Sequence, residues 1–190
     1  MRVVFRVDAS LDIGSGHVMR CLVLAIELRI RGHEVIFGCT PLSGDMRHFV
    51  RQHGFEVIDL AKPKAKDNFV ASSPYELWLE KSVAEDARDF VDSFSSIDLL
   101  ITDHYAIGAE WQRYVASALK CRILALDDLG RKHYADIILD QTLGRSRVDY
   151  STSFTRVLAG SQYALVGREF LGQREAALAR VRSQGAVKIL

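Results

Sequence analysis

Residues 3–25 read VVFRVDASLDIGSGHVMRCLVLA, and this stretch joins a strand, a glycine-containing loop and a helix. Three of its first five residues are valines, and such β-branched residues predict a strand over residues 3–7. Apolar side chains then recur at helical spacing from His17 to Arg31, until Gly32 ends the helix. A strand that leads through a loop into a helix is the repeating unit of α/β folds.

The same alternation continues along the chain. Apolar runs predict further strands at residues 34–39, 55–60, 98–103, 122–127 and 137–140, with a brief one at 163–166. Helical patterns predict helices at residues 45–52, 75–94, 109–119 and 168–183, the last weakened at Gly172, and a polar loop at residues 61–74. Because the strands are almost continuously apolar, helices should cover both faces of the sheet. The sequence therefore predicts an α/β fold with a doubly wound parallel sheet.

Length and charge narrow the class of protein. A chain of 190 residues suits one domain or one large half of a two-domain protein. Hydrophobic residues make up 48% of it, which is enough for a packed core and excludes global disorder. The formal net charge of +1 argues against a nucleic-acid binder that works through its overall field.

The cysteines and the apolar stretches indicate a reduced, soluble, cytoplasmic protein. Cys21, Cys39 and Cys121 are odd in number and widely spaced, so neither a disulfide framework nor a structural zinc site is expected. No apolar stretch reaches the roughly 18 residues that a transmembrane helix needs. Residues 1–10 are too short and too charged for a signal peptide.

Polar and ionisable residues gather where the predicted strands end. In open α/β sheets, ligands bind beyond the carboxyl ends of the strands. The residues at these positions are Asp8 and the loop up to His17, Thr40, Asp103-His104-Tyr105, Asp127-Asp128 and Asp140-Gln141. A binding or active site is therefore expected at this edge of the sheet.

The loop Ile13-Gly14-Ser15-Gly16-His17 follows the first strand and opens the first helix. Two glycines allow the backbone to approach a ligand closely, and the N–H groups and positive dipole end of a helix N-terminus suit an anion. The loop is not the dinucleotide fingerprint, because Met19 stands where a third glycine is needed. A tight turn without a ligand is the alternative interpretation.

His17 is the candidate general base. The positive potential at a helix N-terminus disfavours the protonated ring and favours the neutral imidazole that a base requires. In the alternative interpretation, His17 only hydrogen-bonds a neighbouring loop. Arg20, one turn later, faces either the same ligand or the solvent.

Asp103-His104-Tyr105 form a second candidate group, after the most clearly apolar strand. Three residues with polar groups at the end of a strand suit the rim of a substrate site. In the alternative interpretation, Asp103 caps the next helix and His104 lies on the surface.

Two further pairs of residues are less informative. Of Asp127 and Asp128, one is expected to order its loop, and no further acidic spacing supports a metal pair. Trp78 and Trp111 fall on helical faces, where core residues are expected more often than platforms for a ligand.

Taken together, these residues resemble one known family. The pattern Arg6-x-Asp8-Ala9-Ser10-x-x-Ile13-Gly14-x-Gly16-His17-x-x-Arg20-Cys21-x-x-Leu24-Ala25 resembles the opening signature of the nucleotide-sugar hydrolases of pseudaminic acid biosynthesis, which are grouped with spore-coat polysaccharide proteins. The later segments Asp103-His104-Tyr105, Asp127-Asp128, Tyr163-Ala164-Leu165 and Arg168-Glu169-Phe170 resemble the same family in the same order.

The resemblance implies a fold, an activity and a site. Enzymes of this family have two Rossmann-like halves of the GT-B type and hydrolyse UDP-2,4-diacetamido-2,4,6-trideoxy-β-L-altropyranose to UDP and the free sugar. Water attacks the anomeric carbon with inversion, without a metal or other cofactor. The family's catalytic base falls on His17, and the tyrosine that lines its sugar site falls on Tyr105. The other residues expected to bind substrate are Asp8, Gly14, Ser15, Gly16, Arg20, Asp103 and His104.

The chain resembles only the N-terminal half of that family. A C-terminal half with its own glycine-rich motif holds most of the UDP in the family, and no such motif occurs here. We therefore expect residues 1–185 to form the N-terminal Rossmann-like domain, which binds the sugar and carries the base. Residues 186–190 either add a strand to the sheet edge or begin the C-terminal UDP-binding domain, and the second interpretation is the expectation.

Two functions of different classes follow. The first is the catalytic half of a UDP-sugar hydrolase. The second is a non-catalytic half that binds a sugar or a partner and pairs with a separate UDP-binding chain for glycosyl transfer. The expected partners are a UDP-sugar and a C-terminal half in the same or a separate chain, and the exposed inter-domain face could support a homodimer. Neither a membrane nor a nucleic acid is expected as a partner.

Overall fold

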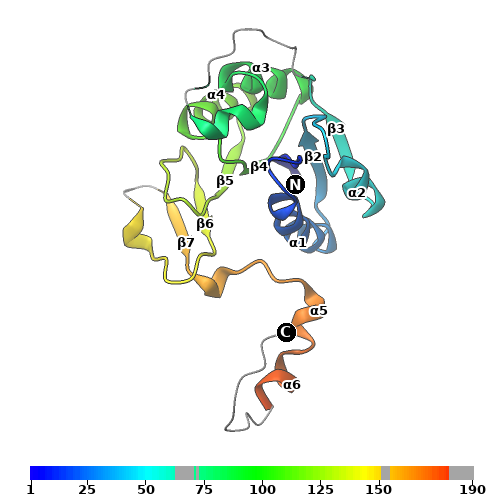
Figure 1. Cartoon of the computed structure of the whole chain (residues 1–190), viewed down its shortest axis with the longest axis vertical. Helices are drawn as coiled ribbons and strands as arrows, with labels where there is room; N and C mark the ends of the chain where they lie inside the picture. The colour runs from blue at the N-terminus through cyan, green and yellow to red at the C-terminus, as the bar shows by residue number, and fades with distance from the viewer. Residues whose placement is uncertain (63–70, 72, 151–154, 180–190) are drawn as a thin grey trace.

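The computed structural model describes residues 1–62, 71, 73–150 and 155–179. Seven strands form one parallel sheet in the order β3-β2-β1-β4-β5-β6-β7, which confirms the predicted doubly wound fold (Figure 1). They are β1 (Arg2–Val7), β2 (Glu34–Cys39), β3 (Glu56–Asp59), β4 (Leu99–Asp103), β5 (Arg122–Leu126), β6 (Ile137–Asp140) and β7 (Arg156–Ala159). The order of strands reverses between β1 and β4, and ligands of such sheets bind at that point.

Both faces of β1 are buried, which explains its almost continuous apolar sequence. Val3, Phe5 and Val7 belong to one hydrophobic core, and Val4 belongs to a second core on the other face. The first core includes residues of α1 (Gly16–Ile30) and α2 (Arg47–Gln52). The second includes residues of α3 (Val83–Ser93) and α4 (Ala109–Leu119), which lie side by side in Figure 1.

Arg6 is a charged residue one position before the end of this buried strand, with no exposed side-chain surface. Its NH1 group lies 2.8 Å from Asp8 Oδ2, and its NH2 group lies 2.6 Å from Asp86 Oδ2 on α3. The indole Nε1 of Trp111 on α4 also donates to Asp86, at 2.9 Å. A buried charge is tolerated only when it is paired in this way, and here the pairing ties α3 and α4 to the central strand.

The prediction of one long helix over residues 75–94 is wrong. The structure has a short 3-10 helix, η1 (Pro74–Leu79), and then α3. Glu80 adopts a left-handed conformation (φ 54°), which ends η1, and Ser82 begins α3 with a capping box to Glu85. The helical periodicity on both sides of Glu80 hid this local break.

The strand predicted over residues 163–166 is also wrong. The structure has a 3-10 turn, η3 (Ser161–Tyr163), and the last strand is β7, which precedes it; η2 (Arg147–Asp149) is another short turn. β7 is a four-residue edge strand with one buried residue, so its sequence carries little of the apolar signal that marks the central strands.

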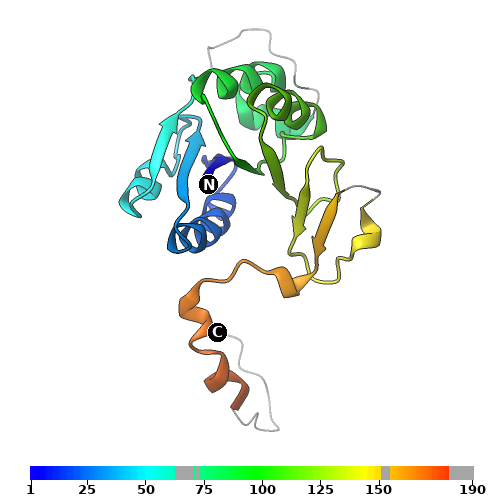
Figure 2. The ribbon, with the colours of Figure 1, turned by 180° about the vertical axis from the view of Figure 1, so that it is seen from behind.

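The segment after η3 leaves the sheet. Figure 2 shows α5 (Arg168–Leu171) and α6 (Arg174–Ala179) away from the strands. A single helix was predicted over residues 168–183, but the two helices are separated at Gly172–Gln173. An ion pair between Arg168 and Glu27 ties α5 to α1. The expected start of a second domain at 186–190, most of the loop 61–74 and the end of the predicted last helix lie outside the described residues. Among the described helices, none combines the length and the apolar character needed to cross a bilayer.

Candidate active site

His17 and Asp103 meet at the carboxyl edge of the sheet. His17 stands in the first turn of α1, and Asp103 is the last residue of β4, paired in register with Val7 of β1. The ring Nδ1 lies 2.7 Å from Asp103 Oδ1, and the Asp103 side chain has no exposed surface. An ionised carboxylate only accepts hydrogen bonds, so Nδ1 donates to it, and in a neutral ring the lone pair is then on Nε2. This tautomer is the one that a general base at Nε2 needs.

Arg20 lies against the same carboxylate rather than in solvent. Its Nε donates to Asp103 Oδ2 at 2.6 Å and its NH2 donates to Oδ1 at 2.5 Å, while NH1 donates to Asp128 Oδ2 at 2.9 Å. Burial alone would raise the pKa of Asp103, but the hydrogen bonds from Arg20 and His17 outweigh it and hold that pKa below its ordinary value. The carboxylate therefore stays ionised beside the imidazole.

Tyr105 and Trp78 contact the His17 ring, and Tyr75 packs against both of them. Tyr105 meets it edge to face, with ring centroids 4.7 Å apart, and Trp78 stacks on Tyr105 at 5.4 Å. Tyr75 lies 5.1 Å from both Trp78 and Tyr105. Burial, and then a hydrogen bond to Asp128, raise the pKa of Tyr105, so its hydroxyl remains a donor.

Trp78 and Trp111 therefore differ from one another. Trp111 is a core residue, as predicted. The prediction for Trp78 is wrong, because its ring is half-buried and faces Tyr105 and His17. Tyr75 and Trp78 were not among the candidate site residues predicted from the sequence. Their signal in the sequence is a pair of aromatic residues three positions apart, which begins directly after Pro74.

The glycine loop lies open at the same edge. Gly14, Ser15 and Gly16 are exposed, and Ser15 precedes α1 without a side-chain cap. A Cβ at Gly14 or Gly16 would meet nothing within 4 Å, and Gly14 has a positive φ of 77°. The N-terminus of α1 is thus accessible to a ligand, beside the His17–Asp103 pair.

Asp8 and His104 lie beneath this rim instead of on it. Asp8 Oδ1 accepts from the Thr40 N–H at 2.7 Å, and its other oxygen faces Arg6. His104 Nδ1 accepts from the Ala106 N–H at 3.1 Å, and its Nε2 lies 3.8 Å from Asp8. The surface placement considered for His104 is wrong: its burial lowers its pKa to about 4, despite the opposing charge of Asp8. The alternative role of Asp103 is wrong as well, because α4 begins after Gly108.

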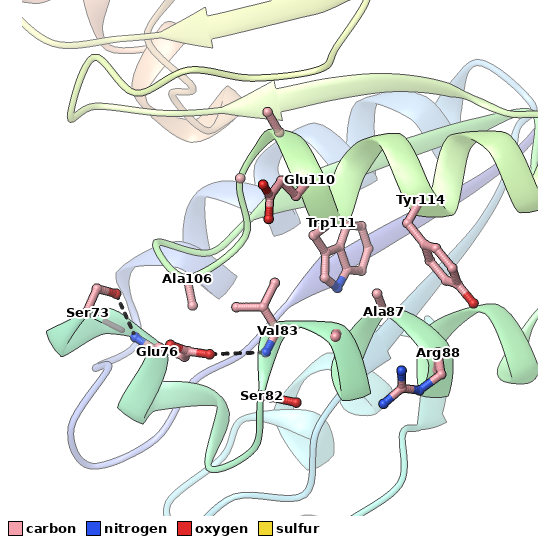
Figure 3. A pocket seen from close by; sticks show the side chains of 13 residues that line it. Ser73, Glu76, Ser82, Val83, Ala87, Arg88, Ala106, Glu110, Trp111 and Tyr114 are labelled. Atoms are coloured by element: carbon pink, nitrogen blue, oxygen red, sulfur yellow. Dashed lines mark hydrogen bonds between the residues drawn. The ribbon is translucent and has the colours of Figure 1, made fainter. Parts of the chain in front are cut away.

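A separate cavity of about 650 Å³ lies between the first turns of α3 and α4 (Figure 3). Glu76 and Trp111 line it, and Glu76 accepts a hydrogen bond from the Val83 N–H. None of the predicted site residues lines this cavity. Among the described residues, no group of three His, Cys, Asp or Glu side chains is arranged to hold a metal ion.

Comparison with solved structures defines the class of fold. The structure resembles that of MurG from Acinetobacter baumannii with a TM-score of 0.52 and 15% identity, over 84% of this chain and 45% of that one. The chain therefore has the Rossmann-like fold of one half of a GT-B protein.

Comparison of sequences identifies the relatives. The chain is a homologue of the N-terminal half of a UDP-sugar hydrolase: it is 30% identical over 173 residues to the UDP-2,4-diacetamido-2,4,6-trideoxy-beta-L-altropyranose hydrolase of Campylobacter jejuni, which is 90% of this chain and 53% of that protein. An uncharacterised protein of Methanocaldococcus jannaschii is 25% identical over 200 residues, which is 100% of this chain and 36% of that protein. The chain thus spans about half or less of these relatives, and no protein-family model matches it.

Proposed function

We propose that this chain is the base-bearing half of a nucleotide-sugar hydrolase, which releases UDP from a UDP-linked diacetamido-trideoxy hexose. One observation carries the proposal: the His17–Asp103 pair, with Nδ1 and Oδ1 2.7 Å apart, stands beside the open N-terminus of α1, at the edge where ligands of open α/β sheets bind. The relation to the Campylobacter hydrolase supports the substrate. A C-terminal half, in the same or a separate chain, supplies most of the UDP contacts.

His17 acts as the general base in this reaction. Its Nε2 takes a proton from water while the water oxygen bonds to the anomeric carbon on the face opposite UDP. The bond between the anomeric carbon and the phosphate oxygen breaks, and UDP leaves with that bonding pair, so the configuration is inverted. Asp103 holds the tautomer and stabilises the imidazolium that forms.

The other residues at this edge either face the substrate or support the residues that do. Ser15 and Gly16 offer backbone N–H groups to an anionic part of the substrate, and Tyr105 contacts the sugar. The Gly14 N–H already donates to the Ser10 carbonyl oxygen at 2.8 Å, so Gly14 contributes only the room for a close approach. Arg20 and Asp128 fix the Asp103 carboxylate and the Tyr105 hydroxyl. Asp8 and His104, which are buried, support the rim from beneath.

His17→Ala tests the proposal in the protein as it is expressed in its host, with UDP release as the assay. The variant should lose roughly 10²–10⁴-fold in kcat. KM should change little, because one neutral hydrogen bond to substrate contributes only about 0.5–1.5 kcal/mol. His48→Ala, on an exposed position of α2, is the control.

The outcome separates the two classes of function. A variant with normal kcat and raised KM would make His17 a binding residue and would refute its role as the base. A wild-type protein that binds the UDP-sugar without hydrolysing it would favour the non-catalytic half instead.

A further inference from the structure

Arg131 joins the loop after β5 to the loop that carries Tyr105. Its NH1 group donates to the carbonyl oxygens of Tyr105 at 2.6 Å and of Ile107 at 3.1 Å. Its guanidinium carbon also lies 5.5 Å from the centroid of the Tyr105 ring. One side chain therefore holds the backbone on both sides of Ala106 and packs over the ring of the same loop.

Asp127 fixes Arg131 in turn. Its Oδ1 accepts from Arg131 Nε at 2.8 Å, and its Oδ2 accepts from the Arg131 backbone N–H at 2.9 Å. The Asp127 side chain has no exposed surface, and Tyr150 and His133 contact it from behind. Burial would raise the pKa of Asp127, but the nearby His133 ring and the charge of Arg131 outweigh it and lower that pKa. The carboxylate is thus a fixed, ionised anchor on the rigid end of β5.

The loop that Arg131 holds, residues 105–107, carries the Tyr105 ring, which lies against His17. The Tyr105 ring is 4.7 Å from the His17 ring and 5.4 Å from that of Trp78. A displaced Tyr105 would change the wall beside His17 without touching the His17–Asp103 hydrogen bond. The planar guanidinium is needed because it serves Asp127 and two carbonyl oxygens at once, which a lysine ammonium cannot do.

We propose that Arg131 is a positioning residue of the hydrolase site, which orients Tyr105 against His17 through its bonds to the 105–107 backbone and its anchor on Asp127. The inference rests on the proposed function for its catalytic part. Arg131 contacts Tyr105 and not His17, so it acts through the tyrosine. The assignment also gives Asp127 a role, as the residue that orders the loop after β5.

Arg29 offers a matched control, in the last turn of α1 and so at the opposite end of that helix from His17. Its NH1 group donates to the carbonyl oxygens of His53 at 2.8 Å and Gly54 at 3.3 Å, and its guanidinium carbon lies 4.1 Å from the Phe55 ring centroid. Arg29→Ala therefore removes the same kinds of contact as Arg131→Ala, but from the loop between α2 and β3 that precedes the strand.

Steady-state kinetics on the protein as expressed in its host test the catalytic part. Arg131→Ala and Arg131→Lys should each lower kcat/KM by roughly 10–100-fold, the cost of a misplacement of about 1 Å in a site. Added methylguanidinium should restore part of the activity of Arg131→Ala, and Arg29→Ala should keep wild-type kcat/KM. Equal losses in the Arg131 and Arg29 variants would overturn the inference, because the effect would then be one of stability.

The fluorine NMR signal of 5-fluorotryptophan at position 78 tests the positioning without any turnover. Arg131→Ala should shift this resonance, assigned by its absence in Trp78→Phe, and Arg29→Ala should leave it in place. An unshifted resonance in folded Arg131→Ala would refute the positioning role. If the wild-type protein does not hydrolyse the UDP-sugar, the proposed function fails, and the Trp78 resonance alone still decides whether Arg131 positions Tyr105.

Discussion

The role proposed for His17 depends on Asp103. Its two oxygens face only donors, from His17, Arg20 and Cys21. In Asp103→Asn, the amide oxygen is expected to face Arg20, which leaves the NH2 group against His17 Nδ1. That contact favours hydrogen on Nε2, the wrong tautomer for a base. We expect kcat to fall by roughly 10²–10⁴-fold with little change in KM.

Asp98→Asn is the control for that measurement, because Asp98 precedes β4 at the other end of the strand and accepts from the Arg2 N–H. Circular dichroism establishes that both variants are folded. Near-normal kcat in folded Asp103→Asn would show that the tautomer is not fixed by this carboxylate.

The buried His104 makes the free energy of unfolding depend on pH. Its pKa is about 4 in the folded protein against an ordinary value of 6.5, because burial disfavours the charged ring. The unfolded chain binds the proton first as pH falls, so the stabilisation is complete above pH 6.5 and is lost towards pH 4. Between pH 7 and pH 5 the loss should be about 2 kcal/mol.

His104→Asn removes this titration while its side-chain oxygen can still accept from the Ala106 N–H. Urea denaturation at pH 7 and pH 5 gives the free energy of unfolding of both proteins. The wild type should lose about 2 kcal/mol more than the variant over this range; equal losses would contradict the buried, neutral state of His104.

At the scale of elements, the start of α3 depends on the Ser82 cap. Ser82 accepts from the Glu85 N–H, and Glu85 accepts from the Ser82 N–H. Ser82→Ala should lower the free energy of unfolding by about 1 kcal/mol. Ser93→Ala, at the end of the same helix, removes only a bond to the Asp89 carbonyl and should cost a few tenths of that. Chemical denaturation that gives equal costs would argue against a separate start of α3 at Ser82.

At the scale of the whole molecule, the open carboxyl edge predicts weak binding of UDP by these 190 residues alone. Gly14 and Gly16 are exposed there, and so are the apolar side chains of Leu11, Leu129 and Leu143. The chain spans 53% of the Campylobacter hydrolase, and phosphate contacts account for much of the affinity for a nucleotide. Calorimetry should give a dissociation constant for UDP at least about tenfold, or 1.4 kcal/mol, weaker than that of the Campylobacter enzyme. Equal affinity would contradict the assignment of the UDP contacts to another half.

The sequence by itself determined the α/β class, the parallel sheet and the edge at which the candidate residues lie. These features depend on signals that are local in the chain: apolar runs for β1, β2, β4 and β5, helical periodicity for α1 and α4, and polar residues at the strand ends. Parallel strands then bring residues as distant as His17 and Asp103 to one edge, whatever their exact partners.

Only the tertiary structure decided which of those residues touch. Asp8, Asp103 and Asp127 all follow strands, yet one faces Arg6 beneath the rim, one orients His17, and one anchors Arg131. Trp78 lies against Tyr105 rather than in the predicted core, on the short helix η1 that ends before the left-handed Glu80. The pairs Arg6–Asp86 and His17–Asp103 join residues 80 and 86 positions apart, and such charge pairing leaves no periodic trace in the sequence.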